Sequence, residues 1–167
     1  MLTNNFYKIL LTHMNLEGAT ATITKYDGTT ATVMDPSYVL NGLRYVRCAE
    51  FAAGQYGTYF GTGTTPPTMD DYNLESPILD GTLSSSSTAS PQKGFEQDHA
   101  RIYATHEVTN NSTSDVTVTE VGVFGAPSSS SKNVFMIDRT VLNTPITIPA
   151  GGSKSITIAI KFDYPAE

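Results

Sequence analysis

The chain has 167 residues, a formal net charge of −6 and only 16% charged residues. This length suits a single domain with its own hydrophobic core, and the scattered lysines and arginines argue against nucleic-acid binding, which needs clustered basic residues. The single cysteine, Cys48, excludes an intrachain disulfide, and no apolar run reaches the ~18–20 residues that a membrane-spanning helix requires.

The first predicted element is an amphipathic helix over residues 4–14. Its apolar residues recur at helical spacing: Phe6, Ile9 and Leu10. Asn4 or Asn5 is a suitable residue to cap its first turn. No basic segment precedes the apolar residues and no small-residue cleavage site follows them, so we expect no signal peptide.

Strand signals dominate from there on. Threonine alternates with apolar residues over 19–34, on both sides of Asp27 and Gly28, which predicts a β-hairpin with a two-residue type I′ turn. Alternation over 43–53 predicts a strand with one buried face. Residues 56–61, rich in glycine and aromatic residues, are predicted to form another strand.

The segment 60–78, FGTGTTPPTMDDYNLESPI, interrupts this pattern. Pro66 and Pro67 exclude a central strand there, because proline cannot donate to a strand ladder. Asp70 and Asp71 are expected to begin a single helical turn. We interpret the segment as a rigid connection shaped by glycine and proline, and not as a phosphate-binding loop, since it lacks the lysine and the following helix of that motif.

The second half of the sequence predicts further strands that are separated by polar loops. The serine-rich segment 82–99 is expected to be a long loop. Two alternating segments, 100–110 and 116–125, are predicted to form a second hairpin, and 133–142 another strand. Residues 144–164 predict a strand, a turn and a long final strand. The buried face of that last strand carries Ile156, Ile158, Ile160 and Phe162.

These elements predict an all-β fold, an antiparallel β-sandwich of jelly-roll or Ig-like type with a short N-terminal helix. Residues 1–17 are expected to form a docking helix that lies on the larger body or on a neighbouring subunit. Residues 18–167 are expected to form one sandwich domain, with the serine-rich loop near 82–99.

No catalytic, cofactor or metal site is predicted. His99 and His106 could meet acidic residues at a zinc site, but no ligand spacing supports one; the candidate acids are Asp98, Glu107 and Glu120. Asp70 and Asp71 lack the remainder of a calcium-loop pattern. A pair of carboxylates that meets from distant strands, as in glycosidases, stays open as an alternative.

Aromatic residues gather on both sides of the glycine-rich segment: Tyr56, Tyr59, Phe60 and Tyr72. If they are exposed, they could stack on sugars or form the centre of an interface. If they are buried, they are ordinary sandwich core, and we favour that interpretation.

Two parts of the sequence together resemble the tail-collar and tail-fibre proteins of tailed bacteriophages. The first is GTGTTPPTMDDYNLESPI, and the second is VTEVGVFG followed by FMIDRTVLNTPITIPAGGSKSITIAIKF. Order and spacing agree over roughly residues 56–163. The resemblance rests on a strand with Glu120, Gly122 and Phe124, a strand that ends in a basic residue, an Ala-Gly turn and a closing strand.

The resemblance implies a virion structural protein without enzymatic activity, assembled in the bacterial host cytoplasm. Expected partners are other virion proteins and further copies of the chain, with neither nucleic acid nor membrane. Collar, neck, tail, short-fibre adaptor and capsid decoration are the expected roles. The residues that we expect at interfaces are Phe6, Ile9, Leu10, Tyr59, Phe60, Pro66, Pro67, Tyr72 and Leu74.

The alternative function is a carbohydrate-binding β-sandwich, an adhesin module that contributes to host attachment. Such a module would bind a host-surface glycan through exposed tyrosines and through Asn and Asp side chains at the loop tips, with Tyr56 and Tyr59 as the first candidates. No cofactor is expected for either function.

Overall fold

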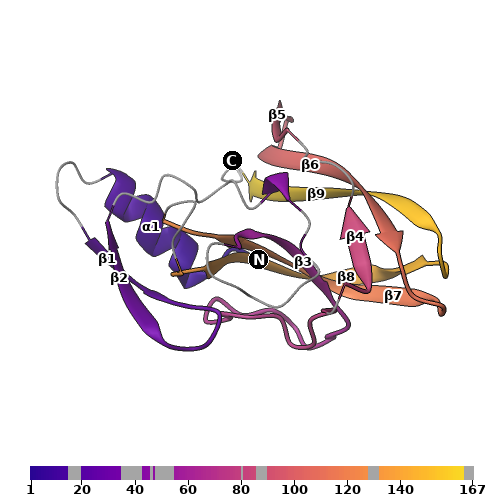
Figure 1. Cartoon of the computed structure of the whole chain (residues 1–167). Helices are drawn as coiled ribbons and strands as arrows, with labels where there is room; N and C mark the ends of the chain where they lie inside the picture. The colour runs from indigo at the N-terminus through magenta and orange to yellow at the C-terminus, as the bar shows by residue number, and fades with distance from the viewer. Residues whose placement is uncertain are drawn as a thin grey trace.

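The computed structural model describes residues 1–14, 20–34, 43–45, 47, 55–79, 81–85, 90–127 and 132–163 (Figure 1). Its elements are α1 (Asn4–Met14), β1 (Thr20–Thr24), β2 (Thr30–Met34), β3 (Gly57–Gly61), β4 (Leu83–Ser85), β5 (Gln92–Phe95), β6 (His99–Asn110), β7 (Val116–Gly125), β8 (Phe135–Ile148) and β9 (Ser153–Asp163). The expected all-β fold with a short N-terminal helix is confirmed.

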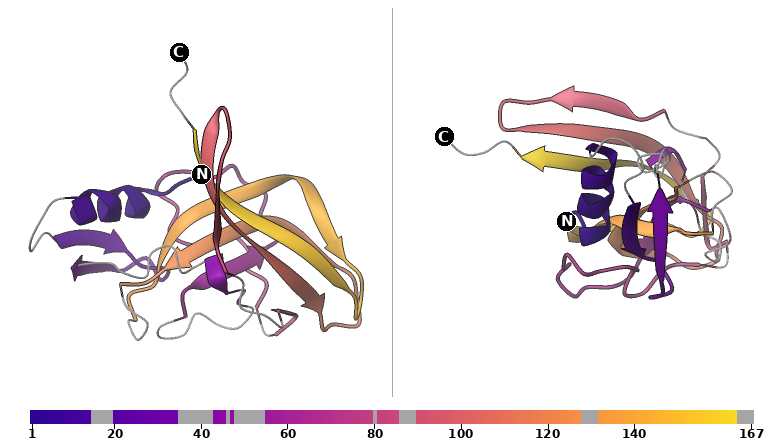
Figure 2. Two further views of the ribbon diagram at one scale, coloured as in Figure 1. Left: turned by 90° about the horizontal axis from the view of Figure 1, so that it is seen from above. Right: turned by 90° about the vertical axis from the view of Figure 1, so that its left-hand side faces the viewer.

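The long strands form two antiparallel sheets that face each other. One sheet has the order β3-β7-β8, and in the other β6 pairs with β4 and β5 and also with β9 (Figures 1 and 2). β6 and β7 therefore lie in different sheets, and the hairpin predicted from 100–110 and 116–125 is wrong. Alternation identified both strands but not their partners: β7 pairs with β8, the next strand along the chain, and β6 pairs with the final strand β9.

The chain crosses between the two sheets at a corner that Asn110 holds together. This side chain is fully buried, donates to the carbonyl oxygens of Ser114 (2.8 Å) and Ile148 (3.0 Å), and accepts from the amide and hydroxyl of Ser112. The amide of Asn110 donates to the Gly152 carbonyl oxygen. One residue thus joins the β6–β7 and β8–β9 connections.

β8 is one continuous strand, although 133–142 and 144–148 were predicted as separate strands. Its register against β7 shifts between Val118 and Glu120, which face Ile146 and Val141 respectively. The extra residues of β8 bulge outwards there and include Pro145, whose missing amide is tolerated outside regular pairing. The predicted buried face of β9 is confirmed for its isoleucines, and Phe162 packs partly buried against the core.

The hairpin predicted at Asp27 and Gly28 is present as β1-β2, but its turn differs. The Gly28 amide donates to the Lys25 carbonyl oxygen, the Lys25 amide donates to that of Thr29, and Gly28 has φ 80°. This is a three-residue loop with a left-handed glycine, not the two-residue turn. The Asp27 carboxylate accepts the Thr29 amide and hydroxyl, which favours this shape.

The helix forms at the predicted residues, and the first three residues attach it to β8. The Thr3 amide donates to the Ile137 carbonyl oxygen, and the Arg139 amide donates to that of Met1. Neither predicted asparagine caps the helix. Asn5 exchanges two hydrogen bonds with the backbone of Thr24, and Asn4 donates to Asp70.

Two hydrophobic clusters occupy the two faces of the β3-β7-β8 sheet. The larger fills the space between the sheets and includes Phe60, Phe135 and Ile137, with Phe6 and Ile9 from the helix. The smaller, around Tyr59, lies on the other face with Leu74, Phe124 and Met136. This sheet is thus covered on both faces, which explains why every residue of β3 is buried.

Two other expectations meet the structure only in part. The predicted loop 82–99 contains β4 and β5, because both short segments pair with β6, so its description as a loop is wrong there. The predicted strand 43–53 lies mostly outside the described residues, as does Cys48. Its described part pairs with β3 through the Arg47 amide and the Tyr45 carbonyl oxygen, both bonded to Thr58.

We predict that Asn110→Ala lowers the free energy of unfolding by about 1–3 kcal/mol, since it leaves buried carbonyl and amide groups without partners. Asn111→Ala is the matched control, because Asn111 is exposed and its side-chain amide donates to the Gly81 carbonyl oxygen. Chemical denaturation of both variants measures the difference, and equal losses would contradict the role of Asn110.

Candidate functional site

The segment 60–78 forms a closed loop over the outer face of the β3-β7-β8 sheet. Its two ends pair with each other: the Thr62 amide donates to the Ser76 carbonyl oxygen, and the Ile78 amide donates to that of Phe60. Leu74 is buried in the cluster around Tyr59. The intervening stretch is thus a compact loop that closes on itself, and we call 60–78 the closed loop.

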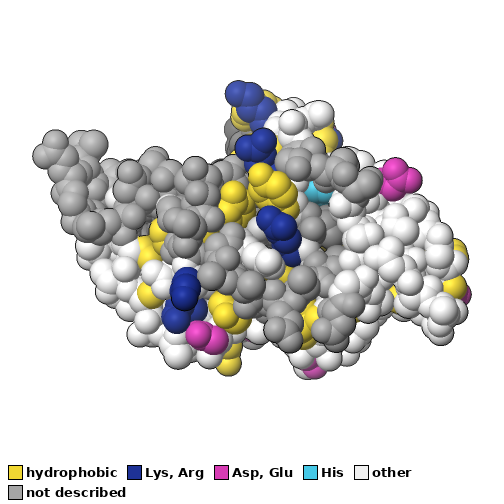
Figure 3. Space-filling view, viewed as in Figure 1, with side chains coloured by type: hydrophobic (Ala, Val, Ile, Leu, Met, Phe, Trp, Pro, Cys, Tyr) yellow, Lys and Arg dark blue, Asp and Glu magenta, His cyan; other side chains and the backbone are white. Residues whose placement is uncertain are grey.

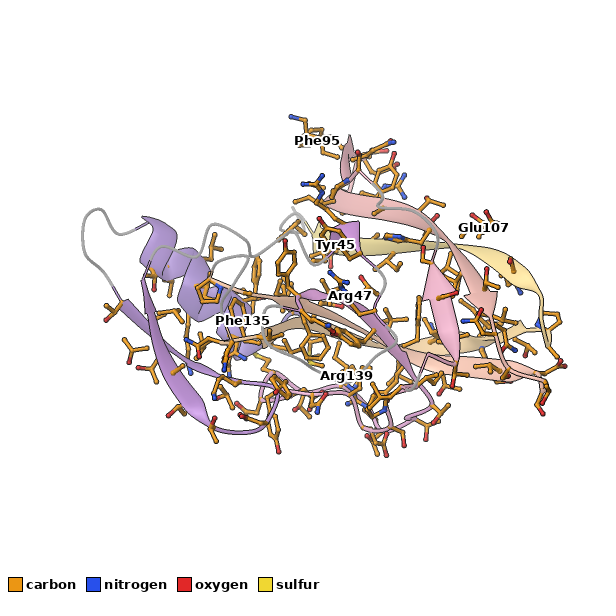
Figure 4. The ribbon with its side chains drawn as sticks, in the orientation of Figure 1. Tyr45, Arg47, Phe95, Glu107, Phe135 and Arg139 are labelled. Carbon is orange, nitrogen blue, oxygen red and sulfur yellow. The ribbon has the colours of Figure 1, made fainter. Side chains whose placement is uncertain are left out.

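A buried ion pair lies beneath the closed loop. Arg139 of β8 donates from Nε to Glu120 Oε2 of β7 at 2.9 Å, and the two side chains are 4% and 0% exposed. Arg139 Nη1 donates to Asp71 Oδ2 at 2.9 Å, and Nη2 lies 3.5 Å from Glu75 Oε2. One guanidinium therefore binds one carboxylate of the sheet and two of the loop, near the middle of the molecule (Figure 4).

The Glu120 carboxylate is fully used by this arrangement. Its Oε1 accepts the amides of Gly63 (3.1 Å) and Ser76 (2.8 Å), and its Oε2 accepts the amide of Glu75 (3.2 Å) besides Arg139. Burying a carboxylate is costly unless it is paired and hydrogen-bonded. Here, amides from both ends of the closed loop and one guanidinium meet that requirement.

The two loop acids also fix the backbone around them. Glu75 Oε2 accepts the amides of Thr64 and Thr65 at 2.8 and 2.9 Å, together with the Thr65 hydroxyl. Asp71 accepts the amide and hydroxyl of Thr68. The helical turn expected at Asp70 and Asp71 is a hydrogen-bonded turn instead, because Asp71 is held between Thr68 and Arg139.

The glycines of the closed loop make room for the Glu120 carboxylate. A Cβ atom on Gly61 would stand 2.7 Å from the Ser76 carbonyl oxygen and closer still to Glu120 Oε1. A Cβ atom on Gly63 would stand 2.6 Å from Glu120 Oε1. Real side chains do not tolerate such distances, so these glycines are required by close packing and not by a ligand.

The hydrogen bonds shift the acidity of these groups. Burial raises the pKa of Asp71, but bonds from the Thr68 amide and from Arg139 outweigh it and hold that pKa below its ordinary value. Bonds from Thr65 and Thr64 lower the pKa of Glu75. Burial opposes the charge of Arg139, yet its bonds to Asp71 and Glu120 raise its pKa overall. Asp71, Glu75 and Arg139 are thus held in their charged forms.

This arrangement is suited to stability. The buried members donate to or accept from one another, and nothing in the described part of the chain brings three possible metal ligands together. His106 is buried and donates from Nε2 to the Leu43 carbonyl oxygen at 2.9 Å, whereas His99 pairs with Asp98. Of the residues considered for a zinc site, His99 thus lies beside Asp98, and His106 has the Leu43 carbonyl oxygen as its partner.

Most residues expected at interfaces are buried within the chain. The helix residues Phe6 and Ile9 and the loop-region residues Tyr59, Phe60 and Leu74 are at most 6% exposed and belong to its two hydrophobic clusters. The expected residues that reach the surface are Leu10, Pro66 and Tyr72, with Pro67 half-buried. Core packing alone accounts for the first group.

An apolar groove lies between α1 and the end of β9. It encloses about 780 Å³, and its lining is Met1, Leu2, Phe6, Tyr7, Leu10, Met69, Asp138, Thr140, Ala159, Lys161, Phe162 and Asp163. The described residues include seven exposed large hydrophobic side chains, and four of them line this groove: Met1, Tyr7, Leu10 and Met69. More than half of the exposed large hydrophobic side chains of the described residues thus gather in one groove.

Only part of this arrangement is visible in the sequence. Glu120 and Arg139 stand out as charged residues within apolar strands, but no local pattern joins them in an ion pair. The groove gave no signal, because Met69 and Phe162 reach it from segments far apart in the sequence. Their meeting depends on how the closed loop and β9 pack against the helix.

Comparisons of the chain with protein-family models, curated proteins and solved structures found no match. The resemblance to phage tail-collar and tail-fibre proteins therefore stays a prediction. Within the described residues, no helix has the length and hydrophobicity needed to cross a bilayer.

We predict that Arg139→Met lowers the free energy of unfolding by about 3–5 kcal/mol, since it leaves Glu120 buried without its cation. Glu120→Gln should cost less in that variant than in the native chain, with a coupling of about 1 kcal/mol or more. Arg101→Met is the control, because it removes an exposed ion pair with Glu96 and should cost less than about 1 kcal/mol. Denaturation midpoints that rank the two arginine variants equally would contradict the prediction.

We also predict that the free energy of unfolding depends on pH through the titration of Asp71. Because folding lowers the pKa of this carboxyl, its stabilisation is present above the unfolded value of about 4 and is lost as pH falls through the folded pKa. The native chain should thus exceed Asp71→Asn in unfolding free energy at neutral pH, and the gap should close in acid. The control is Asp70→Asn, which removes a carboxylate bonded to Asn4. A gap that is independent of pH would refute this.

Proposed function

We propose that the chain is a non-enzymatic structural protein of a bacteriophage virion. It would act by symmetric assembly onto the particle as a collar, neck, tail, short-fibre adaptor or capsid-decoration subunit. Its partners would be other virion proteins and copies of itself, with assembly in the bacterial host cytoplasm.

The observation that supports this proposal most is the convergence of the resembling segments. The Gly-Thr-Pro segment, the strand with Glu120 and the strand that ends in Arg139 are separate in sequence, yet they meet in one ion-pair centre. The order and the residue types of the three segments therefore have a structural explanation: together they hold the closed loop on the sheet. Here the charged residues of the pattern hold a loop on a sheet. Such a structural role is what we expect of a protein that acts by assembly.

The surface also suits assembly better than catalysis. Uncharged polar groups cover much of the described face in Figure 3, and few charged side chains interrupt them. The carboxylates of Asp71 and Glu120 are occupied by their ion pairs with Arg139. The groove between α1 and β9, in contrast, presents apolar side chains. Protein contacts with large apolar side chains at their centre have this character.

The alternative, a carbohydrate-binding adhesin module, loses the tyrosines that were assigned to it. Tyr59 is fully buried and Tyr56 is 8% exposed, so neither presents a ring face on which a sugar could stack. Tyr7 and Tyr72 are exposed, but Tyr7 lies on α1 and Tyr72 in the closed loop, and neither is one of the two first candidates. A role in contact with host glycans would need other residues.

Immunoelectron microscopy of purified phage particles that carry this gene tests the proposal. Antibodies raised against the purified chain should label the capsid, neck or tail, and the position of the label distinguishes the roles. Intact particles without label, together with absence of the chain from their protein content, would refute it. Antibody preincubated with the purified chain is the control.

A further inference from the structure

The hairpin of β5 and the start of β6 projects from the body of the molecule (Figures 1 and 2). At its end lies Phe95, which pairs across the hairpin with Ala100 and is 76% exposed. This is the largest exposed fraction among the large hydrophobic side chains of the described residues. Figure 4 places it at the outer margin of the molecule. An aromatic ring held out on a paired hairpin is a preformed knob.

We propose that the apolar groove between α1 and β9 receives the Phe95 hairpin of a second copy of this chain. The inference rests on the proposed assembly of copies and adds which two surfaces meet. Phe95 and the four exposed groove residues are five of the seven exposed large hydrophobic side chains in the described residues. One contact between copies would cover all five.

Charge permits a second copy as the occupant. The chain carries a net charge of −6, so copies repel one another in general. The two surfaces are exceptions, because each is balanced. The groove has two positive and two negative groups: the Met1 ammonium, Lys161, Asp138 and Asp163. The hairpin also has two of each: Lys93, Arg101, Glu96 and Asp98.

The size of the two surfaces also constrains the contact. An aromatic side chain buries about 150–250 Å², whereas a stable protein contact buries about 1,200–2,000 Å² in total. Phe95 alone is therefore too small, and the hairpin strand and the groove walls must contribute the remainder. The ring would act as the central anchor, with Tyr7, Leu10 and Met69 around it.

Knob and groove are different surfaces of one chain, so their contact joins unlike surfaces. Such contacts are heterologous, and they close into rings when the rotation between copies allows it. Ring formation is the kind of symmetric assembly that the proposed function requires. A reciprocal pair, in which each copy fills the groove of the other, would use the same residues.

The test measures association of the purified full chain by sedimentation velocity over a range of concentrations. We expect the native chain to associate, and Phe95→Asp and Leu10→Asp each to weaken association about tenfold or more. Tyr72→Ser is the matched control, since Tyr72 is 44% exposed and lies in neither surface. Circular dichroism checks that each variant is folded. Phe95 is so exposed that its replacement leaves the core intact.

A mixture of the two variants makes the test specific. Phe95→Asp retains an intact groove and Leu10→Asp retains an intact knob, so equal amounts should form pairs that neither variant forms alone. Pairing in the mixture supports the proposal. A native chain that stays monomeric, an unaffected Phe95→Asp variant, or folded variants that fail to pair would overturn it. Particle labelling is independent of these outcomes, so the two proposals can fail separately.

Discussion

The bond between Arg139 and Glu120 is the interaction on which the outer half of the structure depends. Neither side chain can stay charged in a buried position without its partner. Glu120 needs the loop amides as well, and Arg139 needs the loop acids. The ion pair therefore holds the closed loop on the sheet, because each buried charge needs partners from both. Leu74 adds apolar contact between the loop and the sheet.

The same sheet also organises the other side of the molecule. Its inner face meets the sheet of β6 and β9, and its free edge at β8 receives the first three residues of the chain. The backbone of Arg139 bonds Met1 while its side chain holds Asp71. The first residues of the chain and the closed loop are thus fastened to one residue, which places α1 beside β9 and creates the groove.

Much of the local structure followed from the sequence. The helix over residues 4–14, the hairpin at Gly28 and the buried face of β9 were all predicted from periodicity or turn residues. The same reasoning failed at β6 and β7, which it paired with each other. It also failed at β5, because the polar residues of 82–99 reveal nothing of the strand β6 beside them.

The sequence by itself determined most of the secondary structure, the alternation of buried and exposed residues and the rigidity expected of the closed loop. These properties depend on backbone preferences and on side chains a few positions apart. The tertiary structure decided which strands pair, why Glu120 and Arg139 stand in apolar strands, and where apolar side chains remain exposed. Those outcomes depend on residues distant in the chain, and no local pattern records how an ion pair, a corner asparagine and a helix meet in space.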